Sequence, residues 1–186
     1  MLHLVRHGRT ATNAAGRLQG RMDPPIDDVG RGQAEAMAAL VPHIDRLIVS
    51  PALRARQTAA VFGIEPEEDP RWLEMDYGCF DGATIADVPA DVWTGWITDA
   101  DFAPEGGETL RQVAARVFAA CDELLDEART REVVVVTHAT PVKVAMAWAM
   151  GVDMRAAWRA HVDHASVTRV LVRERGPALA AFNLRP

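Results

Sequence analysis

Short aliphatic runs that are followed by polar residues and then by a helical pattern constrain this fold more than any other feature. Leu2 to Val5 and Val133 to Val136 are continuous runs of this kind, and Arg46 to Val49 is a third candidate. Continuous aliphatic runs are typical of strands covered on both faces in a parallel sheet. The sequence therefore predicts an α/β fold with a mainly parallel central sheet and helices on both faces.

Helical patterns follow these strands in the order that an α/β alternation requires. The clearest pattern runs from about Glu108 to Ala128, where apolar residues recur at steps of three and four. Three shorter helices are expected at 30–41, 53–62 and 142–150. Ser50-Pro51 and Thr140-Pro141 each put a capping side chain before a proline, and this predicts that a helix begins there with proline at its first position.

The C-terminal part predicts two further strands. Ser166 to Arg173 and Ala178 to Leu184 flank a turn sequence, Glu174-Arg175-Gly176-Pro177. We expect an antiparallel pair at the edge of the sheet. The acidic stretch from Glu65 to Asp69 is interpreted as a solvated loop.

Length and composition predict one domain over residues 1–186, with a packed core. A net charge of -6, with scattered basic residues, argues against nucleic acid as a partner. No segment predicts a signal peptide or a membrane span, because His138, Pro141 and Lys143 interrupt the longest apolar stretch. Cys79 and Cys121 lack CxxC spacing, so we expect a reduced, cytoplasmic protein without a disulfide framework.

Polar residues with chemical potential lie where the predicted strands end. Arg6-His7-Gly8 follows the first strand, Ser50 to Arg54 follows the second, and Thr137 to Pro141 follows the third. Parallel strands place ligand sites at their carboxyl ends. Two histidines and two arginines are therefore expected to converge at one edge of the sheet.

Such a cluster suits a phosphate dianion. Guanidinium groups match phosphate oxygens, the beginnings of helices offer free backbone N–H groups, and a neutral imidazole can attack phosphorus. His7, His138 and Glu74 could instead be imagined as zinc ligands, but no HxxxH spacing is present and the arginines would repel a cation. We expect no metal and no cofactor.

Five ordered motifs resemble those of the histidine phosphatase superfamily, also called phosphoglycerate mutase-like: LVRHGRT, SPALRARQTA, LEMDYGCFDG, PEGGET and VVVVTHATP. This resemblance implies that His7 is the phosphorylated nucleophile and that Glu74 is the proton donor. It further implies that Arg6, Arg54 and His138 take part in catalysis by surrounding the phosphoryl group. Phosphate or substrate contacts would come from Arg6, Asn13, Gln19, Arg54, His138 and the backbone of Ala139.

Within that superfamily the chain is most similar to small bacterial phosphatases, including the α-ribazole phosphatase type. The segment from Tyr77 to Pro104 is shorter than the corresponding insertion of the mutases. Two positions depart from the family pattern: Arg9 replaces a common acid, and Ala139-Thr140 replaces a common glycine pair. The first could change the preferred substrate charge, and the second leaves the backbone geometry open.

The expected function is hydrolysis of a small soluble phosphomonoester through a phosphohistidine at His7. A phosphomutase and a catalytically idle relative that binds phosphorylated ligands are the alternatives. Three aromatic residues between 93 and 102, namely Trp93, Trp96 and Phe102, could form a wall over the substrate or simply pack in the core. His43, His161 and His164 are expected to be structural or exposed. The sequence predicts neither the physiological substrate nor the oligomeric state.

Overall fold

The computed structural model describes residues 1–186 and contains one six-stranded sheet with the strand order β3-β2-β4-β1-β5-β6. The strands β3, β2, β4 and β1 run parallel to one another, whereas β5 pairs antiparallel with both β1 and β6. The prediction of a mainly parallel sheet is therefore confirmed. The strands are β1 (Leu2–Arg6), β2 (Arg46–Val49), β3 (Glu67–Glu68), β4 (Val133–Thr137), β5 (Val167–Arg173) and β6 (Gly176–Leu184).

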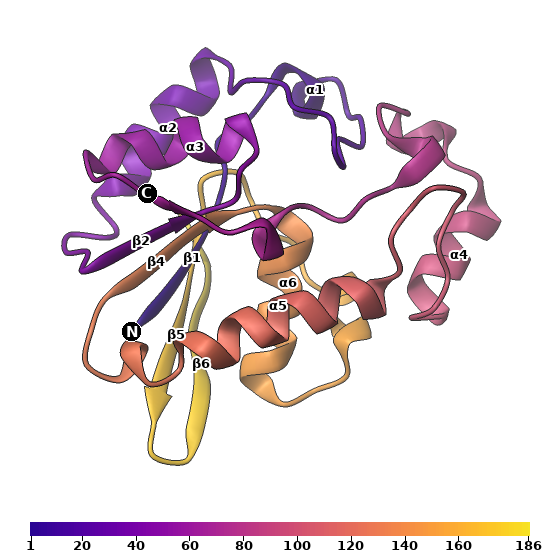
Figure 1. Ribbon diagram of the computed structural model, residues 1–186. Helices are drawn as coiled ribbons and strands as arrows, with labels where there is room; N and C mark the ends of the chain where they lie inside the picture. Colours follow the sequence, from indigo (N-terminus) through magenta and orange to yellow (C-terminus); the bar gives the residue numbers. More distant parts are fainter.

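Helices cover both faces of this sheet, and Figure 1 shows α2 and α3 on one side with α5 and α6 on the other. The α-helices are α1 (Ala11–Ala14), α2 (Asp28–Ala38), α3 (Leu53–Ala59), α4 (Ala90–Thr98), α5 (Leu110–Leu124) and α6 (Ala139–Met150). Short 3-10 helices lie at 60–62, 70–72, 78–80, 85–87, 127–129 and 154–159.

Strand β4 shows why its valines form a continuous run. Val133 and Val135 pack in the larger core with residues of α5 and α6, whereas Val134 and Val136 pack in the smaller core with residues of α2 and α3. All four are fully buried. Since neighbouring side chains of a strand point to opposite faces, a strand between two helical layers needs an apolar residue at every position.

Both predicted proline-based helix starts are wrong. Helix α6 begins at Ala139, with His138 as its capping residue, so Pro141 is the third helical residue. The helix starts earlier because β4 runs through Thr137 and leaves a single residue between strand and helix.

Helix α3 begins at Leu53 and receives no cap from its own preceding side chain. The carboxylate of Asp23 instead accepts the Leu53 amide at 2.7 Å. The Ser50 hydroxyl is 2.7 Å from a ring nitrogen of His138. The Ser50 side chain, which the local sequence predicts to cap α3, therefore contacts His138 instead.

The acidic stretch is also not entirely loop. Glu67 and Glu68 form β3, which pairs with Ile48 and Val49 at the sheet edge. Both glutamates are exposed, and Arg46 makes an ion pair with Glu67 at 2.7 Å. An exposed edge strand of two residues can be acidic because only its backbone takes part in the sheet.

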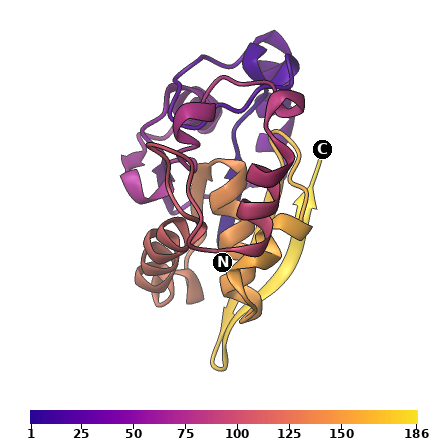
Figure 2. The same cartoon turned by 90° about the vertical axis from the view of Figure 1, so that its right-hand side faces the viewer.

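At the other edge, β5 and β6 form the expected antiparallel pair, visible as the long yellow hairpin in Figure 2. Gly176 and Pro177 belong to β6 rather than to the turn. The start of β5 pairs with the end of β1, because Val167 lies opposite Val5. The residues that precede β5 consequently lie near the carboxyl end of β1.

The segment between Tyr77 and Pro104 holds α4 and an aromatic cluster. Trp96 is fully buried, and its ring lies 5.1 to 6.4 Å between centroids from those of Tyr77, Phe80, Trp93, Phe102 and Trp158. Of the two interpretations offered for these aromatic residues, core packing is therefore the one that the structure favours for Trp96.

Candidate active site

Three adjacent parallel strands deliver polar side chains to one edge of the sheet. His7, His138 and Ser50 directly follow β1, β4 and β2. The amide of His7 donates to the carbonyl of Thr137, and the amide of Ser50 donates to that of Val136, both at 2.9 Å. These bonds continue the sheet pairing beyond the strands, and the two imidazole centroids lie 5.1 Å apart.

His7 is buried and its protonation pattern is set by one backbone contact. Its Nδ1 lies 2.7 Å from the carbonyl oxygen of Gly8. Because a carbonyl can only accept, Nδ1 carries the hydrogen and Nε2 holds the free lone pair. Burial, with the positive charges of Arg6 and Arg54, holds the pKa of His7 well below its ordinary value. The imidazole is therefore neutral at neutral pH.

His138 is fully buried beside it. Its Nε2 lies 2.7 Å from the Ser50 hydroxyl, and its Nδ1 has no hydrogen-bond partner within the protein. Burial, followed by the charge of Arg54, holds the pKa of His138 well below its ordinary value. Two neutral imidazoles thus face each other among permanent cations.

The two arginines are fixed by backbone carbonyls. The terminal nitrogens of Arg54 donate to the carbonyls of Met22 at 2.6 Å and Gly20 at 3.0 Å, and one terminal nitrogen of Arg6 donates to Val162 at 2.5 Å. The Nε atoms of both arginines are buried without a partner in the protein. Burial lowers the pKa of each, yet a guanidinium stays charged at neutral pH.

His164 is a site neighbour that sequence reasoning missed. Its Nε2 lies 2.9 Å from the second terminal nitrogen of Arg6, and its ring centroid is 6.2 Å from that of His7. Since a guanidinium can only donate, His164 accepts and must be neutral. Burial and the charge of Arg6 lower the pKa of His164 to about 3. The available signal was its place just before β5, at the end of β1.

The side chain of Glu74 contacts the first turn of α6. Its Oε1 accepts the amides of Met75 at 2.8 Å and Thr140 at 3.2 Å, whereas Oε2 has only a long contact of 3.5 Å with the Thr140 amide. The side chain is 7% exposed. Its negative charge acts on both Arg6 and Arg54. The structure thus brings together all five residues that the resemblance assigned to catalysis.

Asn13 lies in α1 and Gln19 in the loop that follows it, and both contact Thr10. The side-chain oxygen of Asn13, Oδ1, accepts from the backbone amide of Thr10 at 3.2 Å and from the Thr10 hydroxyl at 3.1 Å. The Gln19 amide donates to the same hydroxyl at 2.5 Å. These contacts hold the loop together and show no interaction with the histidines. Ala139 is the first residue of α6, so its N–H is one of the free donors that a helix leaves at its beginning.

The two departures from the family pattern have simple structural outcomes. Ala139 and Thr140 have no positive φ, because only Ala165 and Asn183 do among non-glycine residues. An alanine at the start of a helix therefore needs no glycine conformation. The charge of Arg9 is paired with Asp27, whose carboxylate lies 2.9 Å from its Nε.

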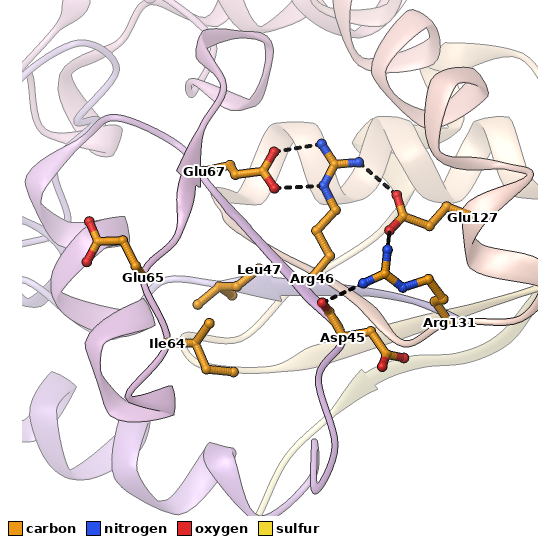
Figure 3. A pocket seen from close by; sticks show the side chains of 8 residues that line it. All are labelled: Asp45, Arg46, Leu47, Ile64, Glu65, Glu67, Glu127 and Arg131. Atoms are coloured by element: carbon orange, nitrogen blue, oxygen red, sulfur yellow. Dashed lines mark hydrogen bonds and ion pairs between the residues drawn. The ribbon is translucent and has the colours of Figure 1, made fainter.

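A separate hollow of about 380 Å³, shown in Figure 3, lies at the amino end of β2. Arg46 pairs with Glu67 and Glu127 at 2.7 and 2.8 Å, and Arg131 pairs with Glu127 at 2.6 Å. Because each cation there already has a carboxylate, this hollow offers no free positive charge to a phosphate. It also lies at the opposite end of the strand from Ser50.

No group of three or more His, Cys, Asp or Glu side chains is arranged to hold a metal ion. None of the helices combines the length and apolar character that a membrane crossing requires.

A buried histidine pair with two fixed guanidiniums, at the carboxyl edge of an α/β sheet, has the chemistry to hold a phosphoryl group. The model of the histidine phosphatase superfamily (branch 1) matches residues 2–185. The chain belongs to this superfamily, and membership supports a phosphatase.

Similarity extends to proteins with different names. The chain is 30% identical to phosphoserine phosphatase 1 of Hydrogenobacter thermophilus, over 98% of this chain and 92% of the relative. It is 29% identical to a probable phosphoglycerate mutase of Yersinia pestis, over 97% and 88%. The chain spans only 49% of the length of three longer mycobacterial relatives that are also 29% identical.

Among solved structures, the α-ribazole phosphatase of Shigella flexneri superimposes with a TM-score of 0.86 and 23% identity, over 99% of this chain and 96% of that one. At this identity the likeness shows the fold. It leaves the substrate open.

Proposed function

We propose that the chain hydrolyses small phosphomonoesters through a phosphohistidine formed at His7. The observation that carries this proposal is the state of His7: a buried neutral imidazole whose Nδ1 donates to Gly8, so that Nε2 keeps its lone pair among cations. A relative named phosphoserine phosphatase, similar over nearly the whole chain, supports hydrolysis as the outcome.

In the first step, the Nε2 lone pair of His7 attacks phosphorus, a P–N bond forms and the P–O ester bond breaks. Arg6 and Arg54 offset the charge on the phosphoryl oxygens, and their unpartnered Nε–H groups are available as donors. In this proposal the Ser50 hydroxyl donates to Nε2 of His138. The single ring proton of neutral His138 is then on Nδ1, which becomes a third hydrogen-bond donor to the phosphoryl oxygens beside the two arginines.

Glu74 supplies the proton that the departing ester oxygen needs. Two backbone amides occupy Oε1, and this leaves Oε2 as the oxygen that carries and releases the proton. In the second step the Glu74 carboxylate accepts a proton from water, the water oxygen attacks phosphorus, and the P–N bond breaks. Inorganic phosphate leaves and His7 returns to its neutral state.

A phosphomutase is the rival that similarity also raises, because one relative is named as such. The short segment from Tyr77 to Pro104 favours hydrolysis, since less chain is available to enclose a product while it reorients. Incubation with 3-phosphoglycerate should release inorganic phosphate and form negligible 2-phosphoglycerate. Rapid interconversion of the two isomers would favour the mutase.

The central test is to trap the phosphoenzyme. Wild-type protein is mixed with a ³²P-labelled phosphomonoester and quenched in alkaline detergent, because the P–N bond of phosphohistidine hydrolyses in acid. We expect label on the wild type and on His43→Ala, whose side chain is 71% exposed, and none on His7→Ala. Label on a folded His7→Ala variant would refute the assignment, as would a wild-type enzyme that turns over substrate without ever carrying label. Activity should also survive exhaustive chelation of divalent metals.

A further inference from the structure

Lys143 is the only lysine in the chain and lies in the first half of α6. It follows Thr140, whose amide contacts Glu74, by three residues, and side chains at this spacing share one face of a helix. Long side chains on a helix lean toward its beginning. Since α6 begins at the carboxyl edge of the sheet, directly after β4 (Figure 1), a side chain that leans toward the beginning of this helix leans toward the site.

The charge of Lys143 has no partner in the protein. Unlike Arg9 with Asp27 or Arg116 with Glu108, it makes neither an ion pair nor a hydrogen bond, although it is half-buried. Burial lowers the pKa of Lys143, while Glu74 raises it and Arg6 lowers it. Both of these neighbours belong to the catalytic cluster, so the ammonium group lies within electrostatic reach of it. A half-buried cation without a partner in the protein is available to an anionic ligand.

The surrounding charges indicate what kind of ligand that is. When Glu74 holds the proton that it donates, the cations of the site are Arg6, Arg54 and Lys143, and Arg54 also has the carboxylate of Asp23 at 4.0 Å. A phosphate monoester brings close to two negative charges at neutral pH. Arg6 and Arg54 are held beside the histidines by backbone carbonyls, so the ammonium group of Lys143, which has no carboxylate partner, is the cation left for a second anionic group of the substrate.

We propose that Lys143 binds a carboxylate on the alcohol part of the substrate, so that the enzyme prefers phosphomonoesters of hydroxy acids. This inference rests on the proposed function, because the roles of Glu74 and the leaving group come from it. It assigns phosphoryl binding to Arg6 and Arg54, and selection of the leaving group to Lys143.

Two pairs of esters isolate the carboxylate. 3-Phosphoglycerate is compared with glycerol 3-phosphate, and O-phospho-L-serine with O-phosphoethanolamine, since the members of each pair differ only at the carboxylate position. The variants are Lys143→Met, which keeps the stem and removes the charge, and Lys143→Arg, which keeps a charge. Arg9→Met is the matched control, because it removes a nearby cation that Asp27 already pairs.

We expect the wild type to prefer the carboxylate member of each pair. Lys143→Met should reduce that preference by about 10- to 100-fold, the usual range for a hydrogen bond to a charged group, mainly through a higher KM. Lys143→Arg should restore part of it, and Arg9→Met should leave it intact. A wild type without preference, equal losses on both members in Lys143→Met, or collapse of the preference in Arg9→Met instead would overturn the proposal.

Binding measurements separate this inference from the proposed function. Calorimetric titration of 3-phosphoglycerate and glycerol 3-phosphate into His7→Ala, with and without Lys143→Met, needs no turnover. A carboxylate preference that depends on Lys143 supports the inference even if the wild type proves to form no phosphohistidine. Equal affinities for the two esters in His7→Ala would refute it even if hydrolysis through His7 is established.

Discussion

Replacement of Ser50 by alanine tests how the site holds its second histidine. The Ser50 hydroxyl and the Nε2 of His138 lie 2.7 Å apart, and both residues are fully buried. In the proposed mechanism the hydroxyl donates to Nε2 and so keeps the remaining proton on Nδ1. Without it, the neutral ring can place its proton on Nε2 and turn a lone pair toward the phosphoryl oxygens, which repels them.

The size of the loss follows from these contacts. The net value of one hydrogen bond, about 1 kcal/mol, sets a lower limit of roughly fivefold. Complete loss of one oriented donor to the transition state sets an upper range of about 10²- to 10³-fold in kcat. We therefore expect Ser50→Ala to lower kcat between these limits, with a smaller change in KM, because the donor matters most when charge develops.

Steady-state hydrolysis of p-nitrophenyl phosphate, together with thermal unfolding, measures this effect. Ser50→Thr retains the hydroxyl and should keep most of the activity. Thr168→Val removes another buried hydroxyl, on β5, and controls for the loss of a buried polar group away from the site. A folded Ser50→Ala variant within twofold of wild type, or a Ser50→Thr variant as slow as Ser50→Ala, would refute this role of the Ser50 hydroxyl.

Three further predictions concern the same site. Glu74→Gln should slow hydrolysis of alkyl phosphates by about 10²- to 10⁴-fold. Hydrolysis of p-nitrophenyl phosphate should slow far less, because p-nitrophenolate departs without a proton. Equal losses on both substrates, or a larger effect in the control variant Asp76→Asn, would show that Glu74 is not the acid. His164→Ala should lower kcat/KM about tenfold or more, because the Arg6 guanidinium loses an acceptor that holds it in place. His164→Asn keeps an acceptor and should recover part of the loss. Identical kinetics of the two variants would contradict this role. The pKa values of His7 and His138 in the folded protein lie below the unfolded value near 6.5, so the unfolded chain binds more protons below that pH. The free energy of unfolding should therefore fall as the pH drops from 6.5, by at most about 1.4 kcal/mol per pH unit for each histidine. Urea unfolding at several pH values measures that slope, which should be shallower in His7→Asn; an unchanged slope in that variant would disprove it.

The parts of the fold and site that local sequence predicts are those that depend on strands and their ends. The continuous valines of β4 required cover on both faces, and the structure supplies it. His7 and His138 could be placed together because parallel neighbouring strands end at one edge. For these residues, position in the chain fixes position in space once the sheet is known.

Residues whose contacts come from a distant segment escaped prediction. Ser50 precedes a proline and has the chemistry of a helix cap, but His138, 88 residues further along, takes its hydroxyl. His164 contacts Arg6 only because β5 returns antiparallel beside β1. Competition between a local cap and a tertiary hydrogen bond is decided by burial, which no local pattern contains.

The family resemblance predicts the roles of residues but not the contacts that each residue makes within the protein. Two pairs of residues illustrate this. The resemblance assigns phosphate or substrate contacts to Asn13 and Gln19, and within the protein both residues contact Thr10. At Ala139 and Thr140, by contrast, the sequence departs from the family while the backbone stays helical. A changed residue therefore does not imply a changed backbone. The physical test in each case is the same: which donor or acceptor the side chain or amide satisfies, and whether its φ lies where only glycine is relaxed.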